Sequence, residues 1–209
     1  MSVSIIGAGN VGRALAMAFT QKGTDVVIGV PNPKKYADTI KPLGNLARLT
    51  TVTDAIEASD VVMLAIPYGA TVPVVSSVND WHNKILVDVS NPIAGALEGL
   101  SVGVTTSGAE EIATHARNAR VVKAFNTTGA ENMADSRYPN GQIFMPVCGD
   151  DSEAKQRVIA LATLIGFNAV DMGELKVARY LEPFAMTWIH LAIKQGYGRK
   201  FAFSLLTRD

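Results

Sequence analysis

Three closely spaced glycines directly follow an apolar segment at the start of the chain. Residues 3–6 lead into a Gly7-x-Gly9-x-x-Gly12 pattern, and apolar residues then recur at helical spacing over residues 11–19. In this order Gly7 can take a tight turn, Gly9 lets the backbone approach a diphosphate, and Gly12 lets the helix pack closely on the strand. The pattern predicts a β-α-β unit that binds a dinucleotide. A glycine turn without a ligand is the alternative.

The end of the second predicted strand, residues 25–29, indicates which dinucleotide. In a site for NAD, an Asp or Glu about 20 residues after the first glycine binds the ribose 2′-hydroxyl. Here Asn32, Lys34 and Lys35 follow the strand, and the first carboxylate is Asp38. Two ammonium groups and an amide would attract a 2′-phosphate, so NADP is the predicted cofactor. The alternative is that both lysines are solvated loop charges.

Composition favours a compact cytoplasmic protein. The 209 residues are 48% hydrophobic, enough for one sizeable core. The 19 basic and 19 acidic residues balance without a basic stripe, which argues against nucleic acid and anionic membranes as partners. Cys148 is the only cysteine, so no intrachain disulfide and no Cys-rich metal site is expected. We see no signal peptide and no apolar run of about 18 residues that would span a membrane.

Apolar runs alternate with helical patterns along the chain, as in a parallel sheet covered by helices. Strands are predicted over residues 60–66, 85–89, 120–124, 143–148 and 167–171, and helices over 71–78, from Ser107, and from Asp151 or Ser152 to Gly166. The fold class is therefore α/β, with a Rossmann-type doubly wound, mostly parallel sheet. We expect an NADP-binding domain over residues 1–173 and a small C-terminal helical extension over residues 174–209.

Ligands in such sheets bind outside the carboxyl ends of the strands. Three segments lie there: Ile66-Pro67-Tyr68, Ser90-Asn91-Pro92-Ile93 and Phe125-Asn126-Thr127-Thr128. Residues 94–106 form a connection long enough to suggest a binding loop or lid. Ser107 and Glu110 form a capping box, so we assign them to structure. Ser90 and Asn91 are expected to contact the cofactor, although a plain strand exit is the alternative.

These residues resemble a known family. Residues 5–16, the strand 26–29 with lysines beyond it, Ile66-Pro67 followed by an aromatic residue, and residues 146–151 look like the NADPH-dependent reductases of the hydroxy-deazaflavin coenzyme. The resemblance continues through residues 171–173 and 179–182, so it covers nearly the whole chain. The cytoplasmic domain of the six-transmembrane ferric reductases is similar too, including Ser90-Asn91 and residues 123–126. Members bind NADP on a Rossmann domain and pass hydride to a flavin-like ring.

The resemblance implies roles for individual residues. Gly7, Gly9, Asn10, Val11 and Gly12 would hold the diphosphate, Lys35 or Lys34 the 2′-phosphate, and Ile66, Pro67 and the Ala130 backbone would flank the nicotinamide. With the positions chosen above, the cofactor-binding candidates are Gly7, Gly9, Asn10, Val11, Gly12, Asn32, Lys34, Lys35, Ala65, Ile66, Pro67, Ser90, Asn91, Asn126 and Ala130, and the substrate-binding candidates are Tyr68, Pro92 and Ile93.

The chain departs from the family at two places. Val30-Pro31 stands where many relatives have Ser-Arg, which removes a guanidinium that could bind a phosphate through two hydrogen bonds. Tyr68 stands where the deazaflavin enzymes carry a Trp. The first difference weakens the expected preference for NADP, and the second bears on the acceptor.

The predicted activity is hydride transfer between NADPH and a flavin or deazaflavin. This reaction needs two rings held in contact, so no catalytic side chain is assigned. The alternative within enzymes is reduction of a small imine or carbonyl, for which Lys123, Tyr68 or His115 would have to be the acid. For Lys123, which ends a predicted strand, a positioning role is the first interpretation. A non-catalytic NADPH-sensing protein is the alternative from another class.

The C-terminal segment suggests a homodimer. Residues 184–193 form a predicted helix in which only Thr187 and His190 are polar, so it is apolar nearly all round. A peripheral helix of this kind is readily covered by a second subunit. The alternative is a helix packed between the sheet and the tail of residues 199–206.

Overall fold

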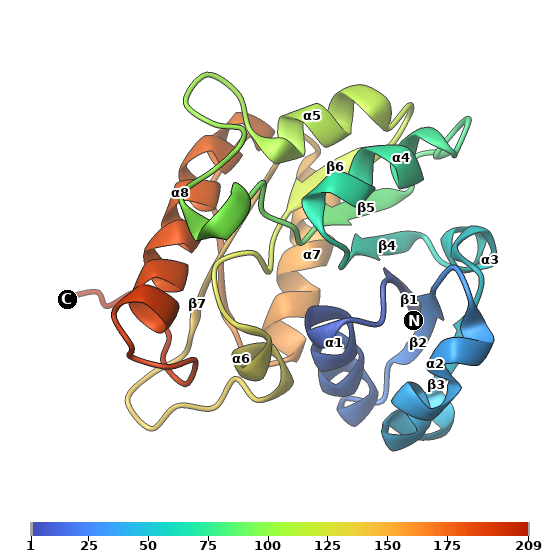
Figure 1. The fold of residues 1–209 in the computed structure, drawn as a ribbon, viewed down its shortest axis with the longest axis horizontal. Coiled ribbons are helices and arrows are strands. Elements are labelled where there is room, and N and C mark those ends of the chain that lie inside the picture. Colours follow the sequence, from blue (N-terminus) through green and yellow to red (C-terminus); the bar gives the residue numbers. More distant parts are fainter. Residues whose placement is uncertain (1, 209) are drawn as a thin grey trace.

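A computed structural model describes residues 2–208, which form one eight-stranded sheet in the order β3-β2-β1-β4-β5-β6-β7-β8 (Figure 1). The strands are β1 (Ser2–Ile6), β2 (Asp25–Gly29), β3 (Ala47–Thr50), β4 (Val61–Leu64), β5 (Ile85–Asp88), β6 (Arg120–Lys123), β7 (Phe144–Gly149) and β8 (Asn168–Asp171). Neighbouring strands are parallel except β6 and β7, which pair antiparallel. The predicted Rossmann-type, mostly parallel fold is confirmed.

Helices cover both faces of the sheet (Figure 1). They are α1 (Asn10–Gln21), α2 (Pro33–Ile40), α3 (Val52–Ala58), α4 (Thr71–Ser76), α5 (Gly108–His115), α6 (Ala130–Ala134), α7 (Ser152–Leu164) and α8 (Ala178–Ile189). Short 3-10 turns lie at Lys41–Leu46, Tyr68–Ala70, Gly95–Leu97 and Leu175–Val177, and a π turn at His190–Lys194 follows α8. Buried residues of α1, α6 and α7 pack in one core cluster, and those of α3, α4 and α5 pack in the other.

The side chains of β4 show why the central strands are apolar throughout. Val61 and Met63 point into one core cluster, whereas Val62 and Leu64 point into the other. Successive residues of a strand face opposite sides of the sheet, and here both sides are buried under helices. Such a strand has no solvated face, so a continuous apolar run results.

The strand order places the functional edge of the sheet. The chain builds β1, β2 and β3 outward in one direction and then crosses to β4 on the other side of β1. Next to this crossover the loops after β1 and β4 diverge, and ligands of doubly wound sheets bind in the resulting crevice. The glycine turn after β1 therefore faces the loops that follow β4 and β5.

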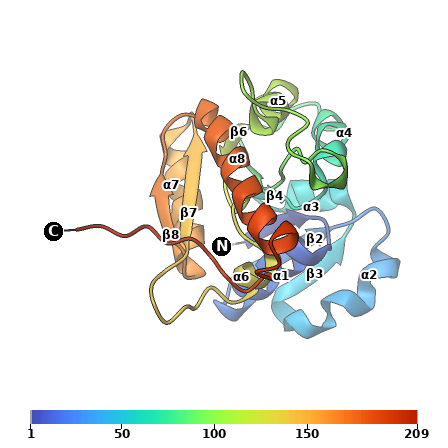
Figure 2. The same cartoon turned by 60° about the vertical axis from the view of Figure 1, so that its left-hand side comes forward.

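The C-terminal tail packs on α8 (Figure 2). Trp188 is only 4% exposed; its ring stacks on Phe201 at 5.3 Å, and its Nε1 donates a hydrogen bond of 2.9 Å to the Phe201 carbonyl. Phe184 lies 4.9 Å from Phe203, whose carbonyl accepts a hydrogen bond from the Phe144 amide. The tail thus covers one face of α8. This packing corresponds to the alternative in which the tail of residues 199–206, and not a second subunit, covers the apolar helix. Tyr180, at 74% exposure, stays on the outward face.

The structure also contains elements that the sequence patterns did not predict. The edge strand β3, with α2 and α3 on either side of it along the chain, lies in a stretch whose residues are mostly half-buried or exposed, so its apolar pattern is weak. The predicted strand 60–66 is shorter, and α8 begins well before residue 184. No helix within residues 2–208 is both long and apolar enough to cross a membrane.

Candidate functional site

The three glycines of the first turn differ in what surrounds them. At Gly7, where φ is +108°, a Cβ would lie 2.5 Å from the Ala65 carbonyl oxygen, and at Gly12 it would lie 2.1 Å from the Gly7 oxygen. Both positions therefore exclude larger residues by close packing. A Cβ at Gly9 would meet nothing within 4 Å, so the space above Gly9 is open.

The start of α1 is suited to an anion. Gly9 is its N-cap, no side chain caps the helix, and its first turn contains no acidic residue. The free amide groups and the positive end of the helix dipole favour a bound phosphate. The Gly7 amide also donates a hydrogen bond of 2.9 Å to the Gly29 carbonyl, which ties this turn to the end of β2. These features fit a dinucleotide diphosphate.

A cleft of about 390 Å³ opens beside the glycine turn. Predicted site residues line most of it: Gly9, Asn10, Val11, Ala65, Ile66, Pro67, Tyr68, Ser90, Asn91, Ile93 and Ala130. Val89 and Arg199 line it as well and were not predicted. The cleft brings together the loops after β1, β4 and β5, the start of α6 and the C-terminal tail.

Asn32, Lys34 and Lys35 lie outside this cleft, at the start of α2. All three are exposed, and the Asn32 side chain makes no capping hydrogen bond although Asn32 is the N-cap. Because β2 pairs with β1, this helix start lies at the same edge of the sheet as the glycine turn. The three exposed side chains are therefore accessible to a phosphate group of a dinucleotide bound at the glycine turn.

Asn126 and Pro92 support the cleft from behind. The Asn126 side-chain nitrogen donates a hydrogen bond of 2.9 Å to Asn91 Oδ1, and Asn91 Nδ2 donates one of the same length to the Asn126 carbonyl. Pro92 is buried, and its carbonyl accepts a hydrogen bond of 2.7 Å from the Ser101 amide. Asn126 thus orients Asn91, and Pro92 fastens the long loop instead of lining the cleft.

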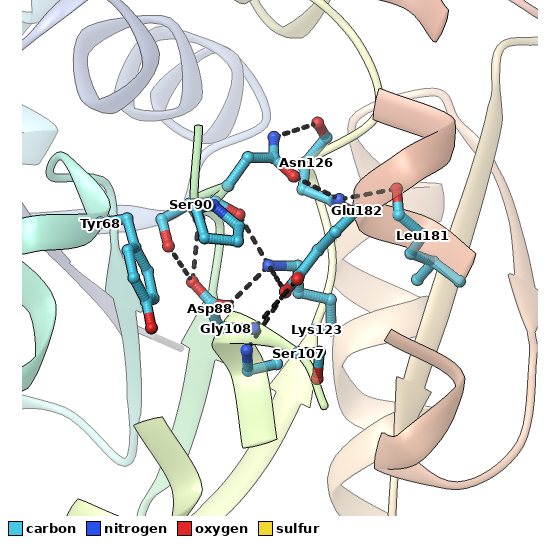
Figure 3. Close-up of polar contacts among 12 residues, drawn as sticks. Tyr68, Asp88, Ser90, Ser107, Gly108, Lys123, Asn126, Leu181 and Glu182 are labelled. Carbon is cyan, nitrogen blue, oxygen red and sulfur yellow. Dashed lines mark hydrogen bonds and ion pairs between the residues drawn. The ribbon is translucent and has the colours of Figure 1, made fainter. Parts of the chain in front are cut away.

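A buried ion cluster lies beneath the loop that carries Ser90 (Figure 3). The side chain of Lys123 is fully buried, and its Nζ donates hydrogen bonds to Asp88 Oδ2 at 2.7 Å, Glu182 Oε1 at 2.9 Å and the Ser90 carbonyl at 2.6 Å. These three bonds use every proton of the ammonium group. Burial alone would lower the pKa of Lys123, but the ion pairs with Asp88 and Glu182 outweigh it and hold this pKa above its usual value.

Both carboxylates of the cluster make further bonds. Asp88 Oδ1 accepts hydrogen bonds from the Ser90 amide at 2.9 Å and the Ser90 hydroxyl at 2.7 Å. Glu182, on α8, accepts hydrogen bonds from the amides of Gly108 at 2.9 Å and Ala109 at 3.1 Å, at the start of α5. The cluster therefore fixes Ser90 and joins α5 and α8 to the loop that lines the cleft.

Sequence reasoning did not single out Asp88 or Glu182. The available signal was an acidic residue at the end of an otherwise apolar strand, and a second one inside a largely apolar helix. Lys123 was weighed as a proton donor, but the ammonium is enclosed by its partners and does not line the cleft. Its geometry is that of a positioning residue.

Tyr68 and His115, the other proton donors considered, differ in location. Tyr68 is half-buried and lines the cleft, and its hydroxyl donates a hydrogen bond to Glu111. The pKa of Tyr68 is raised above its usual value, mainly by burial of the phenol and secondly by its hydrogen bond to Glu111. His115 is exposed near the end of α5 and does not line the cleft. Across residues 2–208, no three His, Cys, Asp or Glu side chains group to hold a metal ion.

The predicted capping box is present at the start of α5. The Ser107 hydroxyl oxygen accepts a hydrogen bond of 3.2 Å from the Glu110 amide, and the hydroxyl donates one of 2.7 Å to the Glu110 carboxylate. Glu110 also forms an ion pair of 2.6 Å with Arg179, on α8. Both residues of the box therefore serve the packing of α5 on α8.

Comparison with known proteins supports the resemblance. Residues 2–92, less than half of the 209-residue chain, match the family described as NADP oxidoreductase, coenzyme F420-dependent. This match confirms the resemblance stated from the sequence motifs and the predicted cofactor, NADP(H).

Proteins from several organisms are similar to this chain over most of its length. The chain is 35% identical over 185 residues to Metalloreductase STEAP3 of Rattus norvegicus, covering 88% of this chain and 36% of that protein, so it spans about a third of that relative. The crystal structure of a putative F420-dependent NADP-reductase from Arthrobacter sp. FB24 is 27% identical with a TM-score of 0.87, covering 98% of this chain and 99% of that one. Hypothetical protein SMa0349 from Sinorhizobium meliloti is 30% identical with a TM-score of 0.79, covering 100% and 96%.

The surroundings of Gly9 and Gly12 predict that alanine at the first position affects cofactor binding, whereas alanine at the second affects stability. Gly9→Ala should leave the free energy of unfolding nearly unchanged and weaken NADPH binding by about tenfold or more, because the methyl group enters the open space above α1. Gly12→Ala should lower the free energy of unfolding by about 1–3 kcal/mol through overpacking. Urea unfolding and fluorescence titration with NADPH measure both effects. Equal stability losses in the two variants would contradict the assignment.

Proposed function

We propose that this protein transfers a hydride between NADPH and a flavin or deazaflavin coenzyme bound in the cleft. The observation that carries the proposal is the character of the cleft walls. Ile66, Pro67 and Ile93 supply apolar surface for flat rings, and the polar side chains that line the cleft with them include no free acid or ammonium group. Hydride transfer between two rings needs contact and exclusion of water more than proton transfer.

In this proposal the cofactor lies along the edge of the sheet. The amides of Gly9, Asn10 and Val11 bind the diphosphate, while Lys34 and Lys35 bind the 2′-phosphate with help from Asn32. When bound, the dihydronicotinamide supplies the hydride, next to Ile66, Pro67 and the Ala130 backbone. Ser90 and Asn91 are held by the ion cluster and by Asn126, so they present a fixed polar surface to the cofactor.

The acceptor ring is assigned to the outer part of the cleft. Tyr68 offers a half-buried aromatic face, and its hydroxyl is bound to Glu111 on α5, which fixes the ring. Ile93 adds exposed apolar surface on the adjacent loop. A planar, weakly polar ring system matches these two side chains better than a small hydrophilic substrate does.

Reduction of a small imine or carbonyl is the second candidate, and Tyr68 is the residue that favours it. Its hydroxyl is the one phenol that lines the cleft. The raised pKa of Tyr68 opposes this role, because a proton donor works best when its pKa lies near the working pH.

An acceptor assay separates the two candidates. NADPH oxidation is followed with flavins, deazaflavin, quinones, ferric chelates and small carbonyls or imines. We expect turnover with flavin or deazaflavin, and Tyr68→Phe should retain more than about a tenth of it, since general acid catalysis contributes about 10²-fold or more. Turnover confined to carbonyls or imines, lost in Tyr68→Phe with NADPH binding intact, would assign the second candidate. Tight NADPH binding without any turnover would assign an NADPH sensor.

The lysine pair should determine the preference for NADPH over NADH. The double substitution Lys34→Ala and Lys35→Ala should weaken NADPH binding by about tenfold to 100-fold, because charge-assisted contacts that contribute about 1.5–3 kcal/mol in total are lost. NADH binding should stay unchanged. Titration with both cofactors measures the difference. Lys22→Ala, an exposed residue at the far end of α1, is the control. If the double variant still prefers NADPH, recognition of the 2′-phosphate is assigned to Asn32 or to backbone amides instead of the lysines.

We also propose a homodimer that uses the outward face of α8. Tyr180, on α8, is 74% exposed, and Ile193, in the π turn that follows α8, is 45% exposed. Light scattering at low micromolar concentration should give twice the chain mass of 22.2 kDa. Tyr180→Glu should shift the protein to the monomer, whereas Leu46→Glu, beside β3 at the opposite edge of the sheet, should not. A monomeric wild-type protein would refute the proposal.

A further inference from the structure

Arg199 is the one residue with a charged side chain among those that line the cleft. It belongs to the C-terminal tail, which no sequence motif connected with the cofactor. Its Nε donates a hydrogen bond of 2.8 Å to Glu131, the residue after Ala130 in the first turn of α6. Because α6 packs against α1, this ion pair lies on the side of the cleft that the glycine turn forms.

The tail holds Arg199 in this place by several contacts. Gly196 and Gly198, both at φ +73°, turn the chain back after α8, and Figure 2 shows the segment passing beside α6. Two residues later, the Phe201 carbonyl accepts hydrogen bonds from Asn132 Nδ2 at 2.7 Å and Trp188 Nε1 at 2.9 Å. The Arg199 guanidinium also lies 5.7 Å from the Trp188 ring, a favourable distance for a cation–π contact. The position of the guanidinium is therefore set by folding.

The hydrogen bonds of the guanidinium leave room for a ligand. Its pair with Glu131 uses Nε, and no further hydrogen bond from its terminal nitrogens is found within residues 2–208. The side chain is 45% exposed, so these nitrogens are accessible. The guanidinium of an arginine matches phosphate oxygens in geometry and charge. The nearby start of α1 offers backbone amides to a phosphate, but none of its residues that line the cleft has a basic side chain.

We propose that Arg199 binds the diphosphate of NADP(H) opposite the amides at the start of α1, so that the C-terminal tail completes the cofactor site. The inference rests on the cofactor placement proposed above. Glu131 orients the guanidinium through Nε, and the terminal nitrogens face the phosphate oxygens. Arg199 then contributes equally to NADPH and NADH, which share the diphosphate, whereas Lys34 and Lys35 distinguish them.

Ligand titrations on Arg199→Gln test this role. Binding of NADPH and of NADH should weaken in parallel, by about tenfold each, and binding of adenosine 2′-monophosphate, which has no diphosphate, should stay unchanged. Arg199→Lys keeps the charge without the fork and should recover part of the loss. Arg137→Gln is the matched control, because Arg137 is an exposed arginine paired with Asp135 and does not line the cleft.

Other outcomes would overturn the inference. Unchanged affinity for NADPH and NADH would remove Arg199 from the cofactor site, and a higher KM for the acceptor alone would assign it to the acceptor. Loss of adenosine 2′-monophosphate binding in parallel would show general damage to the site instead of a diphosphate contact. If Gly9→Ala leaves NADPH affinity unchanged, the cofactor placement itself fails, whatever Arg199→Gln does.

Discussion

The ion cluster of Lys123, Asp88 and Glu182 is the interaction on which the arrangement of the site depends. It joins the ends of β5 and β6 to α8 and to the start of α5, and it holds Ser90 by its amide, hydroxyl and carbonyl. Loss of one partner from a buried ion pair costs about 3–5 kcal/mol, because the remaining charge is left without compensation. The cluster therefore fixes the position of Ser90 on the cleft wall through three hydrogen bonds.

The cluster also ties the C-terminal segment to the sheet beside the cleft. Glu182 comes from α8, yet its carboxylate binds the ammonium at the end of β6 and the amides that begin α5. The tail after α8 then returns over Trp188 and places Arg199 at the cleft. The expected division near residue 173 therefore separates two parts of the chain that meet in one site.

The glycine turn and the ion cluster fix opposite walls of the cleft. Close packing at Gly7 and Gly12 brings the start of α1 against the sheet, so the amides of its first turn face the open space at Gly9. The cluster fixes the opposite wall through Ser90, and Asn126 fixes Asn91 beside it. A cleft with two fixed walls can hold two rings in contact, which is the main requirement of the proposed hydride transfer.

The sequence by itself determined the parts of this protein that depend on local chemistry. The glycine spacing, the apolar central strands and the capping box of α5 each follow from neighbours along the chain, and the structure has all three. The weakly patterned edge strand β3 escaped prediction, because it is only partly buried.

Only the tertiary structure decided the contacts between residues far apart in sequence. Lys123 is 35 residues from Asp88 and 59 from Glu182, and the identity of these two ion-pair partners is visible only once the three residues meet. The same is true of Arg199 and Glu131, which are 68 residues apart. The sequence does not distinguish Arg199 from other exposed arginines, or the buried Glu182 from exposed glutamates, because no short-range pattern marks either residue. Their surroundings are set by how α5, α6 and α8 pack around the sheet.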